Sequence, residues 1–555
     1  MLRSRYRRIL SFFARFLLNI LWWDIILSRL GFRWLARRTR SKRMRGVAVR
    51  YRSLAIQMGG VMIKVGQFLS TRLDVLPIEI TSELTGLQDE VRPEPIANIL
   101  NVFQAEFKQT PDDVFEWFET TPLASASIGQ VHRARLKTSS TELFHTVVVK
   151  IQRPRIDAII DVDLSALRVV GSWLVRFTVV RKHADVPGLM EEFSRTLYEE
   201  IDYIHEAKNA ERFAENFKDR PDCVVPRVAW DHTTRRVLTL EDVYAIKITD
   251  YTGIEAASID RSEVAARLVD TYFKQVFDDR FFHADPHPGN LFVTPDGEKD
   301  ANGHQPWKLV FVDFGMMGIV PDYLSGGLRE LLIAIGTRDS ARVIKAYQML
   351  NVLLPGADLD LLERAGTQVF EHFWGKSVPE MASMHQEEAR MFVREFEGLL
   401  YEMPFQIPQN FILLGRCASI LSGMCSGLDP SFNVWVSIAP YAQKLIREEV
   451  TTGLDFWLKQ LLEILRTLAA LPQKTDRLLN RLERGKLEVQ NRDLKLQMTR
   501  IERTQRRLTG AVFFAAFFIG SVQLYLAGDQ FLAGAAALAS LLSLGFTLFV
   551  RRPNL

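Results

Sequence analysis

The chain has 555 residues, of which 25% are charged and 47% hydrophobic, which is the usage of globular proteins. Its formal net charge of +4 is too small to indicate nucleic acid as a partner, and we expect none. The three cysteines, Cys223, Cys417 and Cys425, lack the paired spacing of a zinc site or a disulfide framework. A chain of this length is expected to contain about three or four structural units.

Residues 1–45 are predicted to form a basic amphipathic segment on a membrane surface. They carry thirteen Lys or Arg, one acid and three interleaved tryptophans. The apolar run at 9–27 contains Arg15 and Asp24. A charge at the bilayer centre costs about 2.5 to 3.5 kcal/mol, against about 0.3 to 0.6 gained per large apolar residue, so spanning is disfavoured. A helix lying on an anionic leaflet is favoured, and a basic arm in solvent is the alternative.

The middle of the chain changes from helical to strand-rich and back to helical. Residues 46–114 are predicted to be a polar helical extension. Strands are expected at 129–136 (GQVHRARL), 146–151 (TVVVKI) and 236–243, where β-branched and apolar residues lie between turn-forming clusters. From 258 onward, a polar start followed by apolar residues at helical spacing predicts a helix. Strands first and helices after indicate an α+β fold.

The C-terminal part of the sequence is predicted to be a helical connector followed by a hairpin. The connector is predicted at 451–507, and its part from 473 to 507 is highly charged, whereas 509–527 and 531–550 are uncharged stretches of 19 and 20 residues. Each would form a helix about 28 to 30 Å long, which predicts a transmembrane hairpin at 508–552. Arginine pairs on both sides place the ends and the body in the cytoplasm, at the cell inner membrane. A hairpin buried in a soluble protein is the alternative.

The segment HADPHPGN at 283–290 has two interpretations. His283 and His287 are four residues apart, as in a helical metal site with Asp285 close by. The two prolines of the segment oppose such a helix, because interior prolines remove hydrogen bonds and clash with the preceding turn. A zinc-type site would therefore require an irregular loop, and this interpretation stays open.

The second interpretation is a phosphate-handling loop. Asp285 and Asn290 are five residues apart, as in the kinase loop H-R-D-x-x-x-x-N, and Asp313 opens D-F-G after an apolar run. Mg²⁺ prefers oxygen ligands, which Asn290 and Asp313 supply, leaving Asp285 to orient or deprotonate an attacking hydroxyl. Lys150 ends a strand and would neutralise nucleotide phosphates if a carboxylate holds it in place. The ordered set predicts a site for ATP or ADP with Mg²⁺.

Residues 50–440 resemble the UbiB/AarF family of atypical protein-kinase-like proteins. The residues that carry the resemblance are KVGQ at 64–67, LASASIGQVHRA at 123–134, EIDYIHEAKNAERF at 200–213, HADPHPGN at 283–290 and LDPSFN at 428–433. One departure is VRP at 91–93, where the family commonly has two prolines. The resemblance implies a bilobal kinase-like fold, with the KxGQ helical extension before an N-lobe at 115–245 and a C-lobe at 246–450.

The resemblance also implies roles for individual side chains. It implies that Lys150 pairs with Glu206, that Lys64 meets Glu200 and that Gln67 faces the nucleotide. It assigns the nucleotide loop to Ala124, Ser125, Ala126, Ser127 and Ile128. Because alanine lacks the freedom of glycine at positive φ, this loop is expected to hold phosphates differently, and its serine hydroxyls can donate where a backbone amide cannot.

The function implied by the resemblance is a membrane-anchored atypical kinase or ATPase that supports isoprenoid-quinone biosynthesis or membrane-lipid handling. Its expected partners are the lipid bilayer, quinone precursors and quinone-biosynthesis enzymes. In the family the KxGQ segment lies where a protein substrate would dock, which favours ATP hydrolysis over phosphorylation of proteins in trans. Two alternatives remain: a small-molecule phosphotransferase, which shares the D-x-x-x-x-N logic but lacks KxGQ, and a non-catalytic, nucleotide-gated scaffold for membrane enzymes.

Overall fold

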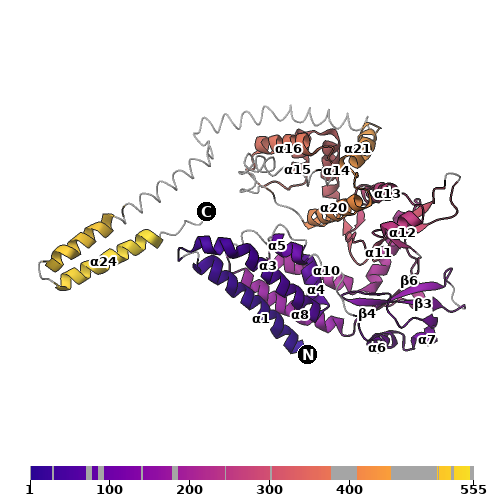
Figure 1. The fold of residues 1–555 in the computed structure, drawn as a ribbon, viewed down its shortest axis with the longest axis horizontal. Coiled ribbons are helices and arrows are strands. Elements are labelled where there is room, and N and C mark those ends of the chain that lie inside the picture. The colour runs from indigo at the N-terminus through magenta and orange to yellow at the C-terminus, as the bar shows by residue number, and fades with distance from the viewer. Residues whose placement is uncertain are drawn as a thin grey trace, which may run out of the picture. The chain divides into compact units, whose positions relative to one another are not determined.

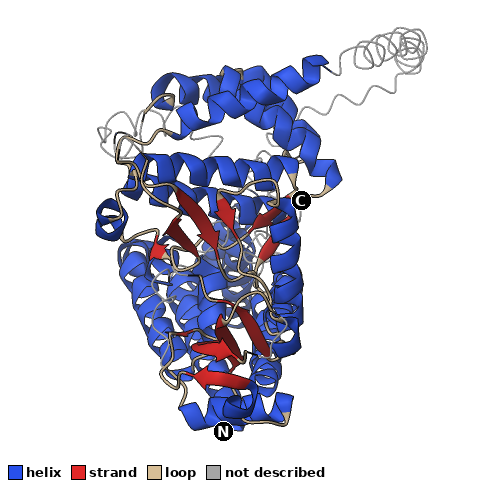
Figure 2. Cartoon of the chain, turned by 90° about the vertical axis from the view of Figure 1, so that its right-hand side faces the viewer, coloured by secondary structure: helices blue, strands red, loops and turns tan. Residues whose placement is uncertain are grey.

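The computed structural model divides into two compact units, Met1–Thr451 and Thr452–Leu555. It describes residues 2–549, apart from the segments 28–29, 71–77, 85–92, 139–141, 178–185, 244, 301–302, 355, 377–379, 381–404, 406–408, 452–508, 510–511 and 527–529. The predicted charged connector lies outside the described residues, except for Thr451. Helices and strands occur together in the first unit, as predicted, and Figure 2 shows the strands in separate groups with helices around them.

The first sheet has five strands and contains both strands predicted between residues 129 and 151. Its order is β1 (Phe115–Phe118), β3 (Gly129–Leu136), β4 (Thr146–Gln152) and β6 (Val237–Glu241), with β2 (Ala124–Ser125) paired to β3. Val147, Val149 and Ile151 of β4 are buried in one cluster with residues of α6 (Ile96–Phe107). Because successive side chains of a strand point to opposite faces, Lys150 points away from that cluster.

Among the described residues, three helices lie between β4 and the next strand, β5 (Cys223–Val224). They are α8 (Ile156–Leu174), α10 (Val186–Glu200) and α11 (Tyr203–Asn216). The carboxylate of Asp202 accepts hydrogen bonds from the backbone N–H groups of Ile204 and His205, so it caps the N-terminus of α11. This cap fixes where α11 begins and therefore where Glu206, in its first turn, is placed.

The remainder of the first unit is mainly helical (Figure 1). A four-stranded sheet has the order β5, β10 (Trp307–Phe311), β9 (Leu291–Pro295) and β7 (Ile246–Lys247), and β8 (Phe281–His283) pairs with β11 (Met317–Ile319). The predicted helix after residue 258 is α13 (Arg261–Phe273), which continues as a π-helical turn, η4 (Lys274–Asp278). The other helices that the structure describes in this part are α12 (Tyr251–Ala256), α14 (Asp322–Thr337), α15 (Ser340–Met349), α16 (Leu359–Phe373), α20 (Gln409–Leu428) and α21 (Val434–Thr451).

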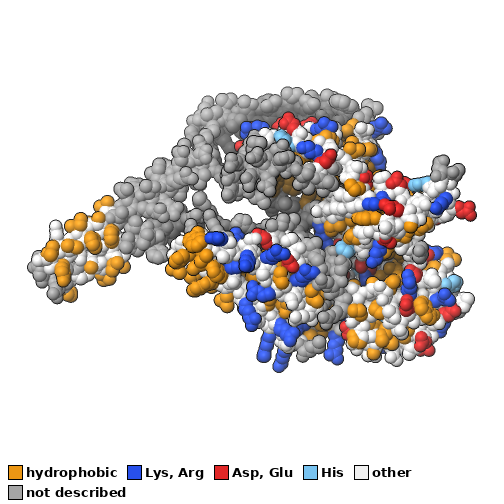
Figure 3. All heavy atoms as spheres, in the orientation of Figure 1, with side chains coloured by type: hydrophobic (Ala, Val, Ile, Leu, Met, Phe, Trp, Pro, Cys, Tyr) orange, Lys and Arg blue, Asp and Glu red, His pale blue; other side chains and the backbone are white. Residues whose placement is uncertain are grey.

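The N-terminal helices pack as part of the first unit. They are α1 (Leu2–Ile20), the π-helical η1 (Leu21–Ile26), α3 (Arg33–Met58), α4 (Val61–Ser70) and α5 (Ile78–Leu84). Ile9 and Leu17 of α1 are buried, and α1 lies against α8. Helix α3 runs through the boundary that we placed between residues 45 and 46, because its sequence is rich in Arg, a good helix former, and contains no proline. Figure 3 shows Lys and Arg side chains gathered over these helices.

The described part of the second unit contains the two helices of the predicted hairpin. Residues 512–526 are helical, and α24 spans Gln530–Phe549. Figure 3 shows hydrophobic side chains over both helices. No helix in the described part of the chain is both long and apolar enough to cross a membrane, so the predicted pair of transmembrane spans is not supported.

Candidate active site

Lys150 of β4, Glu206 of α11 and Asp313 after β10 meet in one cluster. Nζ of Lys150 lies 2.8 and 2.9 Å from the two carboxylate oxygens of Glu206 and 3.2 Å from Oδ2 of Asp313. The side chain of Glu206 is 2% exposed, whereas that of Asp313 is 43% exposed. The Lys150–Glu206 pair is therefore internal, and Asp313 is the carboxylate that a ligand can reach.

The two carboxylates of this cluster differ in proton affinity. Burial raises the pKa of Glu206 to about 7, against the opposing effect of Lys150. Burial also acts to raise the pKa of Asp313, but the cations of Lys150 and Lys64 outweigh it and lower that pKa to about 2. Asp313 therefore stays ionised at physiological pH, as a group that binds a divalent cation must.

The backbone of Asp313 is held in a conformation that few residues adopt. Its φ is 62°, in the left-handed region, where a residue with a Cβ is strained. Nε2 of His283 lies 2.8 Å from the carbonyl oxygen of Asp313. The N–H of Gly315 donates to Oδ1 of Asp313 at 3.2 Å. The surrounding contacts thus fix the direction of this carboxylate.

These contacts oppose the zinc-type interpretation of HADPHPGN. His283 is fully buried and bound to the Asp313 backbone, while Nδ1 of His287 accepts from the N–H of Gly289 at 3.1 Å. The part of the chain that the structure describes holds no group of three His, Cys, Asp or Glu side chains arranged for a metal ion. The described cysteines are free thiols. His283 and His287 therefore bind backbone groups.

The loop after β8 brings Asp285 and Asn290 to the same region. Nδ2 of Asn290 donates to the carbonyl oxygen of Asp285 at 3.1 Å, and the N–H of Val312 donates to the carbonyl oxygen of Asn290 at 3.0 Å. This second bond ties the loop directly to the residue before Asp313. Lys150 and Asp313 thus meet through their side chains, and hydrogen bonds to backbone carbonyl groups hold the loop with Asp285 and Asn290 next to Asp313.

Sequence reasoning missed Arg416 of α20. Its Nη2 donates to Oδ1 of Asp285 at 2.6 Å, and its side chain is 14% exposed. The next residue, Cys417, places Sγ 3.3 Å from the carbonyl oxygen of Ala284. One signal was present in the sequence: Arg416 is the single charge in the apolar run FILLGRCASIL at 411–421.

Lys64, on α4, reaches the same region from the N-terminal extension. Its ammonium forms an ion pair with Glu200, the last residue of α10. Although burial opposes it, the pKa of Lys64 is raised, because the carboxylates of Glu200, Asp285 and Asp313 all stabilise the ammonium. Gln67 is half-buried one turn further along α4. The KxGQ helix thus lies within electrostatic reach of the predicted catalytic carboxylates.

The predicted nucleotide loop consists of β2 and the tight turn that joins it to β3. The N–H of Ala126 donates to the carbonyl oxygen of Gly129 at 2.8 Å. Ser127 and Ile128 are only 5% and 4% exposed, and Ile128 packs in a hydrophobic cluster with residues of α4 and α8. Oγ of Ser125 accepts a hydrogen bond from Arg153 at 3.0 Å. The serine hydroxyls are therefore less open to a ligand than we expected.

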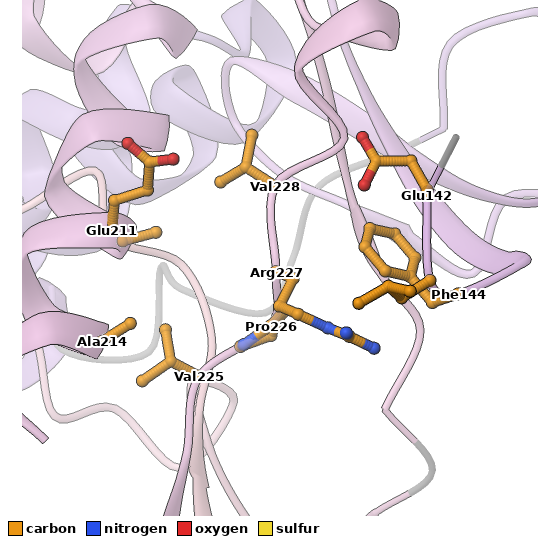
Figure 4. A pocket seen from close by; sticks show the side chains of 10 residues that line it. Glu142, Phe144, Glu211, Ala214, Val225, Pro226, Arg227 and Val228 are labelled. Atoms are coloured by element: carbon orange, nitrogen blue, oxygen red, sulfur yellow. The ribbon is translucent and has the colours of Figure 1, made fainter. Parts of the chain in front are cut away.

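A cavity of about 400 Å³ lies elsewhere on α11 (Figure 4). It is lined by Ala210, Glu211 and Ala214 of α11, together with residues 142–144 and 225–228. None of the predicted site residues lines it. This cavity is therefore separate from the cluster around Lys150.

A strand lysine paired with a helix glutamate, next to a D-x-x-x-x-N loop and a DFG aspartate, defines a protein of the kinase-like class. A family model described as "ABC1 atypical kinase-like domain" matches residues 86–347. A probable protein kinase UbiB of Xanthomonas campestris is 32% identical over 479 residues, covering 85% of this chain and 84% of that protein. The chain therefore belongs to the ABC1/UbiB family of atypical kinase-like proteins, which confirms the resemblance.

The chain is also similar to a curated plant protein and to a solved bacterial structure. The chloroplast protein ACTIVITY OF BC1 COMPLEX KINASE 8 of Arabidopsis thaliana is 35% identical over 421 residues, which are 71% of this chain. This chain spans 53% of the length of that relative. Among solved structures, the Mycobacterium tuberculosis protein Rv3197, in complex with erythromycin, is 20% identical with a TM-score of 0.43, covering 73% of this chain and 95% of that one.

Proposed function

We propose that this protein is an atypical kinase-like ATPase that binds Mg-nucleotide at the Lys150 cluster. The observation that carries the proposal is the meeting of Lys150, Glu206 and Asp313, which come from three separate segments of the chain. A buried ammonium with one internal and one reachable carboxylate suits a phosphate chain with a divalent cation. Family membership supports the same assignment.

Each side chain has a task in this proposal. Asp313 and Asn290 supply the oxygen ligands for Mg²⁺, and the bound ion would neutralise charge on the phosphates. Lys150 contacts the phosphates, and Glu206 holds Lys150 in position. Asp285 orients the attacking water or hydroxyl.

Two contacts favour hydrolysis over transfer to proteins in trans. The ion pair of Lys64 with Glu200 holds the KxGQ helix beside the catalytic carboxylates. The ion pair of Arg416 with Asp285 occupies one oxygen of the proposed orienting carboxylate. Both leave less room at Asp285 for a folded protein substrate than for water.

We further propose that the enzyme works at a membrane, in isoprenoid-quinone biosynthesis or lipid handling, as the family resemblance implies. The basic side chains over the N-terminal helices (Figure 3) and the exposed apolar side chains of the C-terminal helices support contact with an anionic bilayer. Exposed residues of the latter kind include Phe513, Phe518, Leu526, Phe531 and Leu541.

The test is ATP hydrolysis by the purified full chain, in detergent and with liposomes containing anionic lipid and a phenolic quinone precursor. We expect turnover that requires Mg²⁺, stops with excess chelator and rises with the liposomes. Tight nucleotide binding without turnover under all conditions would instead support the scaffold alternative. Stoichiometric phosphate transfer to the phenol would support the small-molecule phosphotransferase.

The Arg416→Gln variant is expected to lower kcat for ATP hydrolysis by about 10- to 100-fold, because Asp285 loses the partner that fixes its direction. The dissociation constant for Mg-ADP should not change, since Arg416 contacts the loop and not the phosphate-binding lysine. Steady-state kinetics and equilibrium binding separate the two quantities. An unchanged kcat would show that this ion pair has no part in turnover.

A further inference from the structure

Arg153, the first residue after β4, makes hydrogen bonds to the predicted nucleotide loop. Its Nε donates to the carbonyl oxygen of Ala126 at 3.2 Å, and its Nη2 donates to Oγ of Ser125 at 3.0 Å. Its own N–H donates to the carbonyl oxygen of Ile128 at 2.8 Å. One residue thus holds three of the five loop residues.

The guanidinium of Arg153 is itself fixed by Glu94. Its Nη1 lies 3.3 Å from Oε2 of Glu94, and the side chain of Arg153 is 14% exposed. Glu94 is held on both sides, because its N–H donates to Oε1 of the buried Gln130 at 2.7 Å and its Oε1 accepts from Asn98 at 2.8 Å. The planar fork of arginine can bind several acceptors at once in a fixed geometry, which a lysine cannot do.

The other end of the loop, where Gly129 begins β3, is tightly packed. A Cβ at Gly129 would lie 2.3 Å from the hydroxyl of Tyr203 and 2.9 Å from the carbonyl oxygen of Ile151. There is therefore no space for a side chain at the start of β3. The residues between, Ala124 to Ile128, have no glycine and can follow a ligand only by breaking contacts.

We propose that Arg153 is a positioning residue that pre-organises the small-residue loop for the nucleotide phosphates, with Glu94 as its fixed counter-ion. This inference rests on the proposed function. The hydrogen bonds made by Arg153 hold the loop in one conformation in the free protein. Binding then carries no further loss of loop freedom, which favours affinity.

The test compares Arg153→Gln with Arg155→Gln in the full chain. Arg155 is exposed, lies two residues further on and makes none of the loop contacts described above, so it serves as the matched control. We expect Arg153→Gln to weaken binding of Mg-ADP about 10-fold while kcat changes less than about 2-fold, because the loop becomes less ordered but the catalytic carboxylates stay in place. Arg155→Gln should bind as the wild type does.

Hydrogen exchange supplies a readout that does not depend on the nucleotide. Amide exchange in residues 124–129 should become faster in Arg153→Gln, and to a smaller degree in Glu94→Gln, which leaves the arginine in place. The double variant should resemble Arg153→Gln alone, since both residues act through one contact. Arg153→Lys should give intermediate exchange, and it carries the test if Arg153→Gln fails to fold.

Unchanged exchange in the loop, or equal weakening by both arginine variants, would overturn the role of Arg153. A fall in kcat at unchanged affinity would also overturn it, since it would place Arg153 in the chemical step. If the wild type itself binds no Mg-ADP, the proposed function fails. The exchange measurements still decide in that case whether Arg153 orders the loop.

Discussion

The Asp313→Asn variant is expected to hydrolyse ATP at least about 100-fold more slowly than the wild type. Asp313 is the reachable carboxylate beside Lys150, and its pKa of about 2 keeps it charged for a cation at physiological pH. A metal ion supplies several kcal/mol of charge stabilisation, and each 1.36 kcal/mol corresponds to about tenfold in rate. An amide keeps the size of the side chain but removes its charge.

Turnover should be measured with Asp219→Asn as the control, because Asp219 is an exposed aspartate outside the cluster. We expect the control to match the wild type and the Mg²⁺ dependence of Asp313→Asn to move to higher concentration. Wild-type turnover in Asp313→Asn would show that any ATP hydrolysis occurs at another site.

The Arg5→Met variant is expected to lower the free energy of unfolding by about 3 to 5 kcal/mol at pH 8. Asp163 of α8 is completely buried, and Arg5 of α1 contacts both of its carboxylate oxygens at 2.7 Å. Arg5 also donates to the carbonyl oxygen of Gly59 at 3.0 Å, so it joins α1 to the turn before the KxGQ helix. Methionine would leave a buried charge without its partner.

The effect of Arg5→Met should decrease at acid pH. Burial raises the pKa of Asp163 above its ordinary value, and Arg5 acts against that rise. Without Arg5 the pKa rises further, so the folded variant binds a proton more readily than the unfolded chain does. A raised folded-state pKa means that stability is retained below the unfolded pKa of about 3.9 and lost as pH rises through the folded value. The loss should therefore be smaller at pH 4 than at pH 8.

Chemical denaturation of the full chain at the two pH values measures this difference. Arg8→Met, at an exposed position of the same helix, should stay within about 0.5 kcal/mol of the wild type. The double variant Arg5→Met with Asp163→Leu should recover most of the loss, because no buried charge remains. A large loss that is equal at both pH values would contradict the electrostatic explanation.

The local sequence pattern alone predicted much of the first, five-stranded sheet. The strands expected at 129–136 and 146–151 agree with β3 and with β4 to within one residue. Alternation and turn residues act over a few positions, so they can be read without knowing the fold.

Length and hydropathy predicted the two ends of the chain less well. They indicated membrane spans at the C-terminus that the described helices do not support. Charge and amphipathicity led us to treat residues 1–45 as a separate surface segment, whereas α1 packs against α8. Ile9 is buried in one hydrophobic cluster with residues of α8, and Arg5 forms an ion pair with Asp163. An apolar stripe on a helix is the same whether it covers protein or lipid, so the sequence pattern cannot distinguish the two.

The sequence by itself determined the kinase-like class of the protein and the candidate residues Lys150, Asp285, Asn290 and Asp313. Each of these residues lies in a short motif in which the chemistry of phosphate and Mg²⁺ requires that residue type. Only the tertiary structure decided what supports them. Arg416 meets Asp285 across 131 residues, Arg5 meets Asp163 across 158, and Arg153 meets Glu94 across 59. Hydrogen bonds of this kind depend on where rigid elements pack, and no local periodicity records the partner of a charged side chain.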